Sequence, residues 1–115
     1  MAWNCRGLVR PKAIRNLRAN IRKYNPDVIF LSETMVLDDR TISIVNSLGF
    51  HLFVYSPAVC KKGGLLLLWR SGVEIEPVHI NSNAISVLVY SDPSHQPWLL
   101  TYVYAPAQWN NKASF

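Results

Sequence analysis

At 115 residues the chain can form one small domain, and its longest apolar run, residues 65–69, is far below the ~20 residues of a membrane-spanning helix. Half of the residues are hydrophobic and 17% are charged, which is rich for a small soluble domain and indicates apolar surface that something else covers. Cys5 and Cys60 lie far apart without metal-site spacing, so the sequence indicates neither a zinc site nor a disulfide framework. An intracellular, reducing setting follows as the default.

Positive charge is concentrated at the start of the chain. The formal net charge is +5, and the first 26 residues contain no acid but hold Arg6, Arg10, Lys12, Arg15, Arg18, Arg22 and Lys23. A polyanionic partner explains this pattern, and a basic solvated helix face explains it about as well.

The first predicted helix begins at Pro11 and ends before Pro26, because the residue preceding a proline avoids the α region. Its apolar stripe recurs at steps of three and four and consists of Ile14, Leu17, Ile21 and Tyr24. The adjoining stripe is basic and consists of Arg15, Arg18 and Arg22. These three arginines are candidate contacts for a nucleic acid.

A buried strand with a carboxylate at its end follows the helix. Residues 28–31 form an unbroken apolar run, which is typical of a strand covered on both faces. Glu33 comes directly after it, at the carboxyl end, where ligand and metal sites of α/β sheets gather. The alternative is an ordinary solvated glutamate that follows a core strand.

The rest of the chain is predicted to contain one helix and then strands. The helix begins near Asp38 or Asp39, uses Ile42, Val45 and Leu48 as its apolar stripe and stops at Gly49. Strands are predicted at residues 52–55, 64–69, 73–75, 85–90 and 98–104. At the start of the chain, Trp3 and Asn4 end a further short strand.

Four short motifs follow one another along the chain: W-N-C-R-G-L at residues 3–8, P-D-V-I-F-L-S-E-T at 26–34, G-G-L-L-L-L-W at 63–69 and T-Y-V-Y-A-P at 101–106. In this order they resemble the successive motifs of the endonuclease/exonuclease/phosphatase superfamily. They are most similar to the endonuclease domain of plant LINE-type non-LTR retrotransposons. The resemblance covers nearly the whole chain, and four spaced motifs are specific where one alone would be weak.

The resemblance implies an α/β fold (α+β in some classifications): half of a four-layer α/β sandwich, with a mixed β-sheet and two flanking helices. It implies a magnesium-dependent phosphodiester cleavage site at the shared edge of two facing sheets. Glu33 matches the glutamate that binds the metal, and Asn4 matches the asparagine that supports the metal and the nucleophile. Tyr104 matches the tyrosine near the scissile phosphate, whereas Tyr102 lacks a proline two residues on and is interpreted as core.

The chemistry of such a site suits these residue types. Mg²⁺ prefers oxygen ligands and keeps several waters, so one or two carboxylates plus substrate phosphate can hold it. An asparagine amide and a tyrosine hydroxyl can donate to oxygen without adding charge. Without the resemblance, Asn4 could simply begin a turn with Gly7, and Tyr104 could cap a core strand.

Two later motifs of the superfamily, an Asp-x-Asn pair and a terminal Ser-Asp-His, are absent from the chain. A full domain is roughly twice as long, within the usual size of single domains. Residues 1–115 are therefore interpreted as a partial domain truncated at both ends, whose first sheet lacks its partner sheet. The missing C-terminal half, or a partner with an apolar surface, would cover that face.

Three hypotheses follow. The chain is a fragment of a Mg²⁺-dependent DNA endonuclease or phosphodiesterase that is inactive alone, it is a non-catalytic remnant that still binds nucleic acid, or it is a degenerate retrotransposon product without stable function. DNA is the expected partner of the parent domain, which makes the nucleus one expected location, and no membrane is involved. The superfamily also contains phosphatases, sphingomyelinases and RNA deadenylases, so the substrate stays open at this point.

Overall fold

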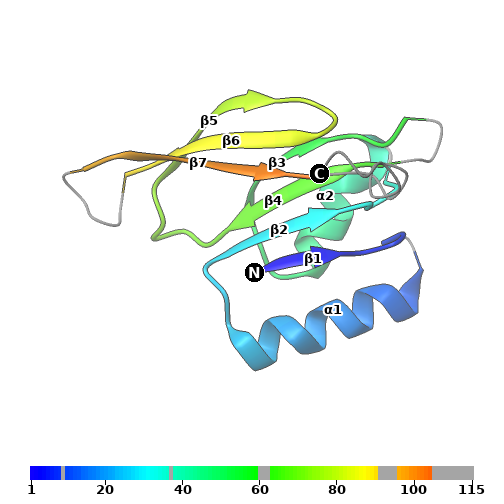
Figure 1. The fold of residues 1–115 in the computed structure, drawn as a ribbon. Coiled ribbons are helices and arrows are strands. Elements are labelled where there is room, and N and C mark those ends of the chain that lie inside the picture. The colour runs from blue at the N-terminus through cyan, green and yellow to red at the C-terminus, as the bar shows by residue number, and fades with distance from the viewer. Residues whose placement is uncertain (9, 37, 60–62, 91–95, 105–115) are drawn as a thin grey trace, which may run out of the picture.

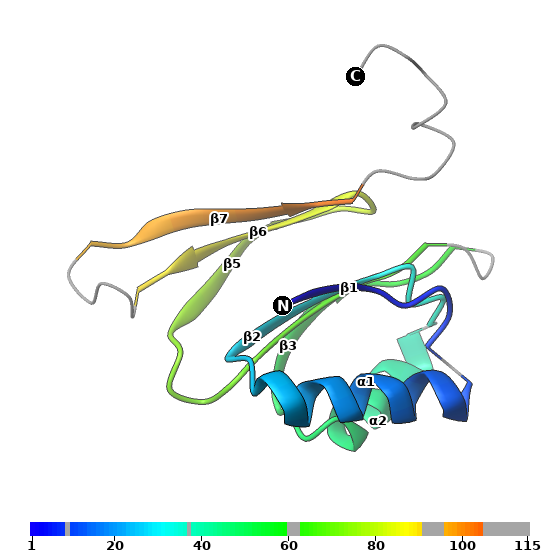
Figure 2. The same cartoon turned by 60° about the horizontal axis from the view of Figure 1, so that its bottom comes forward.

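The computed structural model describes residues 1–8, 10–36, 38–59, 63–90 and 96–104. In chain order the elements are β1 (Ala2–Asn4), α1 (Pro11–Tyr24), β2 (Val28–Ser32), α2 (Asp38–Ser47), β3 (Leu52–Ser56), β4 (Leu65–Trp69), β5 (Ile75–Ile80), β6 (Ala84–Val89) and β7 (Trp98–Val103). Figures 1 and 2 show three layers: both helices, the sheet that contains β2, and the sheet that contains β6.

Helix α1 begins and ends where the sequence predicts. Its last carbonyls are capped by Asn25, which has a left-handed backbone and donates its N–H to the Ile21 carbonyl oxygen at 2.8 Å. Leu17 and Ile21 are buried, but Tyr24 is 61% exposed, so including it in the buried stripe was wrong. Tyr24 lies in the last turn, where its ring contacts the Lys23 ammonium group instead of the core.

The buried stripe of helix α2 contains Val45 and Leu48, as predicted. Ile42 is 62% exposed, while Ile44 is buried beside the predicted Val45. Including Ile42 was wrong, because Thr41 is buried at 3% exposure and takes the inward position in the first turns of the helix. Among the helices in the described part of the chain, none has the length and apolar character needed to cross a bilayer.

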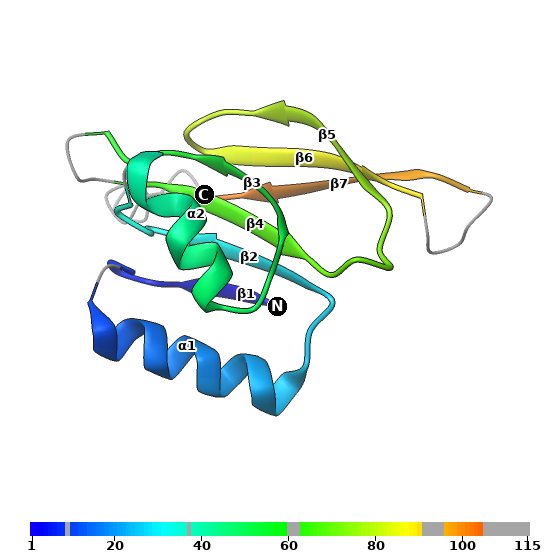
Figure 3. The ribbon, with the colours of Figure 1, turned by 180° about the vertical axis from the view of Figure 1, so that it is seen from behind.

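The first sheet has the order β1-β2-β4-β3 and is mixed, because β1 pairs with β2 in parallel and the other pairs are antiparallel. All five residues of β4 are buried. Leu66 and Leu68 face the helices, which cover this face of the sheet together (Figure 3), and Leu65, Leu67 and Trp69 face the opposite way. Burial on both faces explains why this strand shows no polar alternation.

The second sheet is antiparallel, has the order β5-β6-β7 and covers the other face of the first sheet. Ile85, Val87 and Val89 of β6 pack in one cluster with Leu67 and other residues of the first sheet. The expectation that the first sheet lacks a partner sheet was therefore wrong. The sequence predicted β6 as a strand but did not place it in a sheet. In the structure its alternate residues are buried and form the inner face of the second sheet.

Strand β5 was also predicted incorrectly, at residues 73–75 instead of Ile75–Ile80. Pro77 lies inside it, next to an irregularity in the register between Pro77 and His79. Proline is tolerated there because β5 is an edge strand, with β6 as its one neighbour within the described part of the chain.

Hydrogen bonds tie together the loops that follow β1 and β2. Because the two strands are parallel, both end at the same edge of the sheet, with Asn4 paired to Ser32. Gly7 and Leu8 then donate their N–H groups to the carbonyl oxygens of Glu33 and Thr34, each at 2.8 Å. The backbone around Glu33 is thus fixed by a second loop.

The same edge contains unusual backbone conformations. Arg6, Glu33 and Met35 have left-handed φ values of 48°, 51° and 54°. Such conformations cost of order 1–3 kcal/mol each for ordinary residues and cluster at functional sites. Met35 is held from the other side, because its N–H donates to the Gly63 carbonyl oxygen at 2.8 Å.

A substitution at Gly64 tests how tightly this edge of the sheet is packed. Gly64 has a φ of +96°, and a Cβ there would clash with Thr34 Oγ1 and lie 3.2 Å from the Met35 nitrogen. We expect Gly64→Ala to lower the free energy of unfolding by about 3 kcal/mol, through strain and overpacking together. Urea denaturation measures this loss. Gly49→Ala is the control, because Gly49 has a φ of +85° with nothing near its Cβ position. It should cost about 1 kcal/mol, and equal losses in both variants would contradict the clash.

Cys5 gives a test of core burial. Burial of the thiol, followed by the charge of Glu33, raises the pKa of Cys5 from 9.0 to about 12. At pH 8 roughly one thiol in 10,000 is then ionised, so native Cys5 should react with iodoacetamide far more slowly than in urea. Because the charged form is disfavoured, the rate should rise with pH up to about 12. A Cys60→Ser background leaves Cys5 as the single thiol, since Cys60 lies outside the described residues. Equal native and unfolded rates would contradict the burial.

Candidate functional site

Glu33 is the centre of the candidate site. It directly follows β2, and its left-handed φ turns the chain at the sheet edge. Its carboxylate accepts a hydrogen bond from the side-chain amide of Asn4, the last residue of β1. Two residues far apart in sequence therefore meet because their strands are parallel neighbours.

Both polar atoms of the Asn4 side-chain amide form hydrogen bonds. Asn4 Nδ2 donates to Glu33 Oε2, and Asn4 Oδ1 accepts the backbone N–H of Arg6 at 3.2 Å. The second bond fixes the rotation of the amide, so that its NH₂ group points at the carboxylate. A hydrogen bond to a charged acceptor is stronger than a neutral one, so Asn4 orients Glu33 effectively.

Tyr104 reaches the same carboxylate from the second sheet. It directly follows β7, and its backbone N–H donates to the Asn83 carbonyl oxygen at 2.7 Å. Burial raises the pKa of the Tyr104 hydroxyl, and its hydrogen bond to Glu33 and the charge of Glu33 raise it further. The structure thus brings together the three residues singled out in the sequence: Asn4, Glu33 and Tyr104. Ala105 and Pro106 of the same motif lie outside the described residues.

The donor set suits one class of metal ion. Nowhere in the described parts of the chain do three or more His, Cys, Asp or Glu residues gather closely enough to hold a metal. At the site, Glu33 offers carboxylate oxygens and Asn4 an amide oxygen that already accepts from Arg6. A sparse oxygen set fits a hard cation that keeps its waters and shares a substrate phosphate, and it does not fit a zinc centre.

Basic residues line a groove beside this set. The groove has a volume of about 320 Å³, and Arg6, Arg10 and Lys12 line it together with Trp3 and Asn4. The sequence showed these three charges but gave no reason to assign them to the site. The signal that could have found them is that Arg6 lies in the loop directly after Asn4, and that Arg10 and Lys12 flank the start of the next helix.

The predicted arginine stripe lies elsewhere. Arg18 and Arg22 line a different groove of about 320 Å³, which faces Asn46 and Ser47 of α2. Arg15 is exposed on α1 as well. The structure does not bring Arg18 and Arg22 to the groove that contains Asn4.

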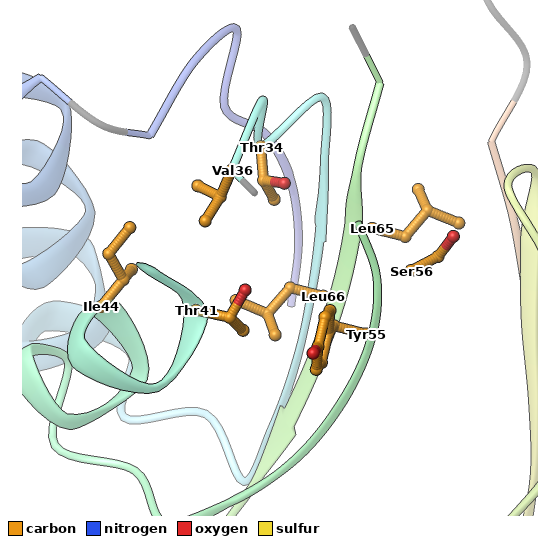
Figure 4. A pocket seen from close by; sticks show the side chains of 8 residues that line it. All are labelled: Thr34, Val36, Thr41, Ile44, Tyr55, Ser56, Leu65 and Leu66. Atoms are coloured by element: carbon orange, nitrogen blue, oxygen red, sulfur yellow. The ribbon is translucent and has the colours of Figure 1, made fainter. Parts of the chain in front are cut away.

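A small cavity lies behind the Glu33 loop and is not a substrate site. It measures about 10 Å³, room for about one water molecule. Figure 4 shows Thr34 and Val36 of the loop, Thr41 and Ile44 of α2, and Leu66 of β4 around it. This volume leaves no room for a substrate.

Solved structures share this fold. AP endonuclease LMAP from Leishmania major is similar with a TM-score of 0.70 and 19% sequence identity, over 91% of this chain and 39% of that chain. The APE2 catalytic domain from Xenopus laevis is similar with a TM-score of 0.56 and 15% identity, over 91% of this chain and 44% of that chain. This chain therefore spans about two fifths of the structures it matches, and the expected α/β fold is confirmed.

Sequence comparison agrees with the fold. No curated protein matches this chain. A family model described as the Endonuclease/Exonuclease/phosphatase family matches residues 1–111, which is nearly the whole sequence. The chain belongs to the Endonuclease/Exonuclease/phosphatase family.

Proposed function

We propose that this chain is part of a magnesium-dependent phosphodiesterase domain that cleaves DNA. The observation that carries the proposal is the meeting of Asn4, Glu33 and Tyr104 at one edge, with residues from both sheets on a single carboxylate. Membership of a family of nucleases and phosphatases supports hydrolysis of a phosphoester as the reaction. The two AP endonuclease structures support a nuclease over a phosphatase.

Each side chain has a separate task in this proposal. Glu33 is the metal ligand, and Asn4 keeps its carboxylate turned toward the open edge. A bound Mg²⁺ would polarise a phosphate oxygen and neutralise charge on the leaving oxygen. Tyr104 holds its hydroxyl on Glu33 and can donate the same proton to a phosphate oxygen when substrate arrives.

DNA is the proposed substrate for two reasons. The W-N-C-R-G-L and L-S-E-T segments resemble plant LINE-type retrotransposon endonucleases, whose substrate is DNA. The groove with Arg6, Arg10 and Lys12 opens beside Asn4, where it can hold the phosphates that flank the cleaved bond. Such a role would place the protein inside the cell, with the nucleus as the site of action.

We also propose that residues 1–115 do not cleave DNA by themselves. In the described residues Glu33 is the carboxylate that meets Asn4 and Tyr104, and it is assigned to the metal. A further segment of the family domain would then supply the groups that orient and deprotonate the attacking water. This division of the site also makes that segment the expected partner of the chain.

A second candidate function is nucleic-acid binding without cleavage, through Arg15, Arg18 and Arg22. It is favoured by the exposure of all three arginines, none of which has an ion-pair partner among the described residues.

A third hypothesis, a degenerate product without a stable fold, predicts no cooperative thermal unfolding. The well-buried core argues for a cooperative transition instead.

Metal binding tests the assignment of Glu33. We expect Glu33→Gln to weaken binding of Tb³⁺, a hard cation whose luminescence nearby tyrosine sensitises, by at least about tenfold, because a charged ligand is lost. Mg²⁺ should displace Tb³⁺ from the unchanged chain. Glu76→Gln is the control, since Glu76 is an exposed carboxylate of the second sheet. Equal effects of the two variants on Tb³⁺ binding would contradict the assignment of Glu33 as a metal ligand.

Cleavage is tested with a chimera in which this chain is completed with the rest of a family domain. The chimera should nick plasmid DNA with Mg²⁺, and Glu33→Gln should abolish this activity.

DNA binding separates the first two candidate functions. We expect Arg10→Gln with Lys12→Gln to weaken binding to a short duplex and to reduce the slope of log affinity against log salt by about 2, one unit per phosphate contact. Fluorescence anisotropy at several salt concentrations measures both effects. Arg18→Gln with Arg22→Gln removes the same charge from the other groove and should change binding less. The reverse order would favour the non-catalytic binding function.

A further inference from the structure

Phe30 and Tyr102 form an aromatic pair across the interface between the two sheets. Phe30 belongs to β2 and Tyr102 to β7, and their rings stack at a centroid distance of 4.7 Å with 8° between the ring planes. Phe30 is 5% exposed, and Tyr102 packs against the same inter-sheet cluster. The motif comparison gave Tyr102 no role other than core, although it lies beside the site.

On both strands the stack lies a few residues from Tyr104 and Glu33. Tyr102 lies on β7 and Tyr104 directly follows that strand, and both side chains pack against the cluster between the sheets. Phe30 lies three residues before Glu33 on β2. The aromatic pair and the Tyr104 side chain are therefore neighbouring contacts of the second sheet with the first.

The distance between strand β7 and the first sheet depends on such contacts. Among the described strands β7 pairs with β6 alone, so backbone hydrogen bonds fix its position within the second sheet. Figure 2 shows the two sheets as separate layers, with β7 in one and β2 in the other. Side-chain packing between the sheets, in which Phe30, Tyr102 and Tyr104 all take part, must therefore set the spacing between them.

We propose that Tyr102 is a positioning residue: its stack on Phe30 sets the spacing between the sheets at the metal-binding edge and so holds the Tyr104 hydroxyl on Glu33. The importance of this contact for catalysis rests on the proposed function. The contact itself does not, because it joins two side chains of this chain. Tyr102 acts through Tyr104 and needs its ring for this role, not its hydroxyl.

Nuclear magnetic resonance of the metal-free chain tests the proposal. In the unchanged protein we expect a nuclear Overhauser effect between the Tyr104 ring and the Glu33 γ protons. Tyr102→Leu should abolish it, because the stack is lost and β7 can shift. Tyr102→Phe should restore it, because the ring remains. The Asn4 side-chain amide signals should stay in place in both variants, since Asn4 and Glu33 both follow strands of the first sheet.

Leu100→Ala is the matched control. Leu100 also lies on β7 and packs against the same inter-sheet cluster, two residues further from the site than Tyr102. Leu100→Ala should lower the midpoint temperature of unfolding and leave the nuclear Overhauser effect between Tyr104 and Glu33 intact. The proposal is overturned if Tyr102→Leu keeps that effect, if Tyr102→Phe loses it, or if Leu100→Ala removes it as completely. None of these outcomes depends on cleavage or on metal binding, so the proposed function can fail independently.

Discussion

Parallel pairing of β1 with β2 is the constraint on which the candidate site depends. In this register Asn4 lies opposite Ser32, so its amide reaches the residue that follows, Glu33. An antiparallel pair would place the ends of the two strands at opposite edges. Parallel pairing requires a crossover connection, and α1 supplies it while covering the first sheet with Leu17 and Ile21. The helix that buries the core and the geometry of the site are therefore products of the same connection.

The site also depends on the face opposite the helices. Leu65, Leu67 and Trp69 of β4 pack against the second sheet, which makes the first sheet the middle of three layers. This burial drives the association of the two sheets, because apolar area is removed from water on both sides of β4. It also places Tyr104, which follows a strand of the second sheet, over a carboxylate of the first. The geometry of a site formed by residues of both sheets therefore depends on how the sheets pack.

The distribution of charge separates two surfaces that look like one in the sequence. The basic residues of α1 lie on two flanks: Lys12 lines the groove that contains Asn4, and Arg18 and Arg22 line the groove beside α2. Only the first flank opens on the groove that contains Asn4. The strained backbone of Arg6 and Glu33 lies at the same edge, where hydrogen bonds between the two loops hold it. Charge, strain and the carboxylate therefore gather at one place, which supports a function there.

The sequence by itself determined the local elements and the family. Pro11 and Pro26 delimit α1, the apolar run at residues 28–31 marks β2, and four ordered motifs pointed to Asn4, Glu33 and Tyr104. Local signals of this kind depend on neighbours in the chain, so one sequence is enough to interpret them. The inward position of Thr41 and the extent of β5 were missed, because packing can override polarity and an edge strand tolerates Pro77. Only the tertiary structure decided that a second sheet covers the first, that Arg6, Arg10 and Lys12 flank the site, and that Tyr102 stacks on Phe30. Each of these depends on distances between segments far apart in the chain, which follow from how the layers pack and not from any local pattern.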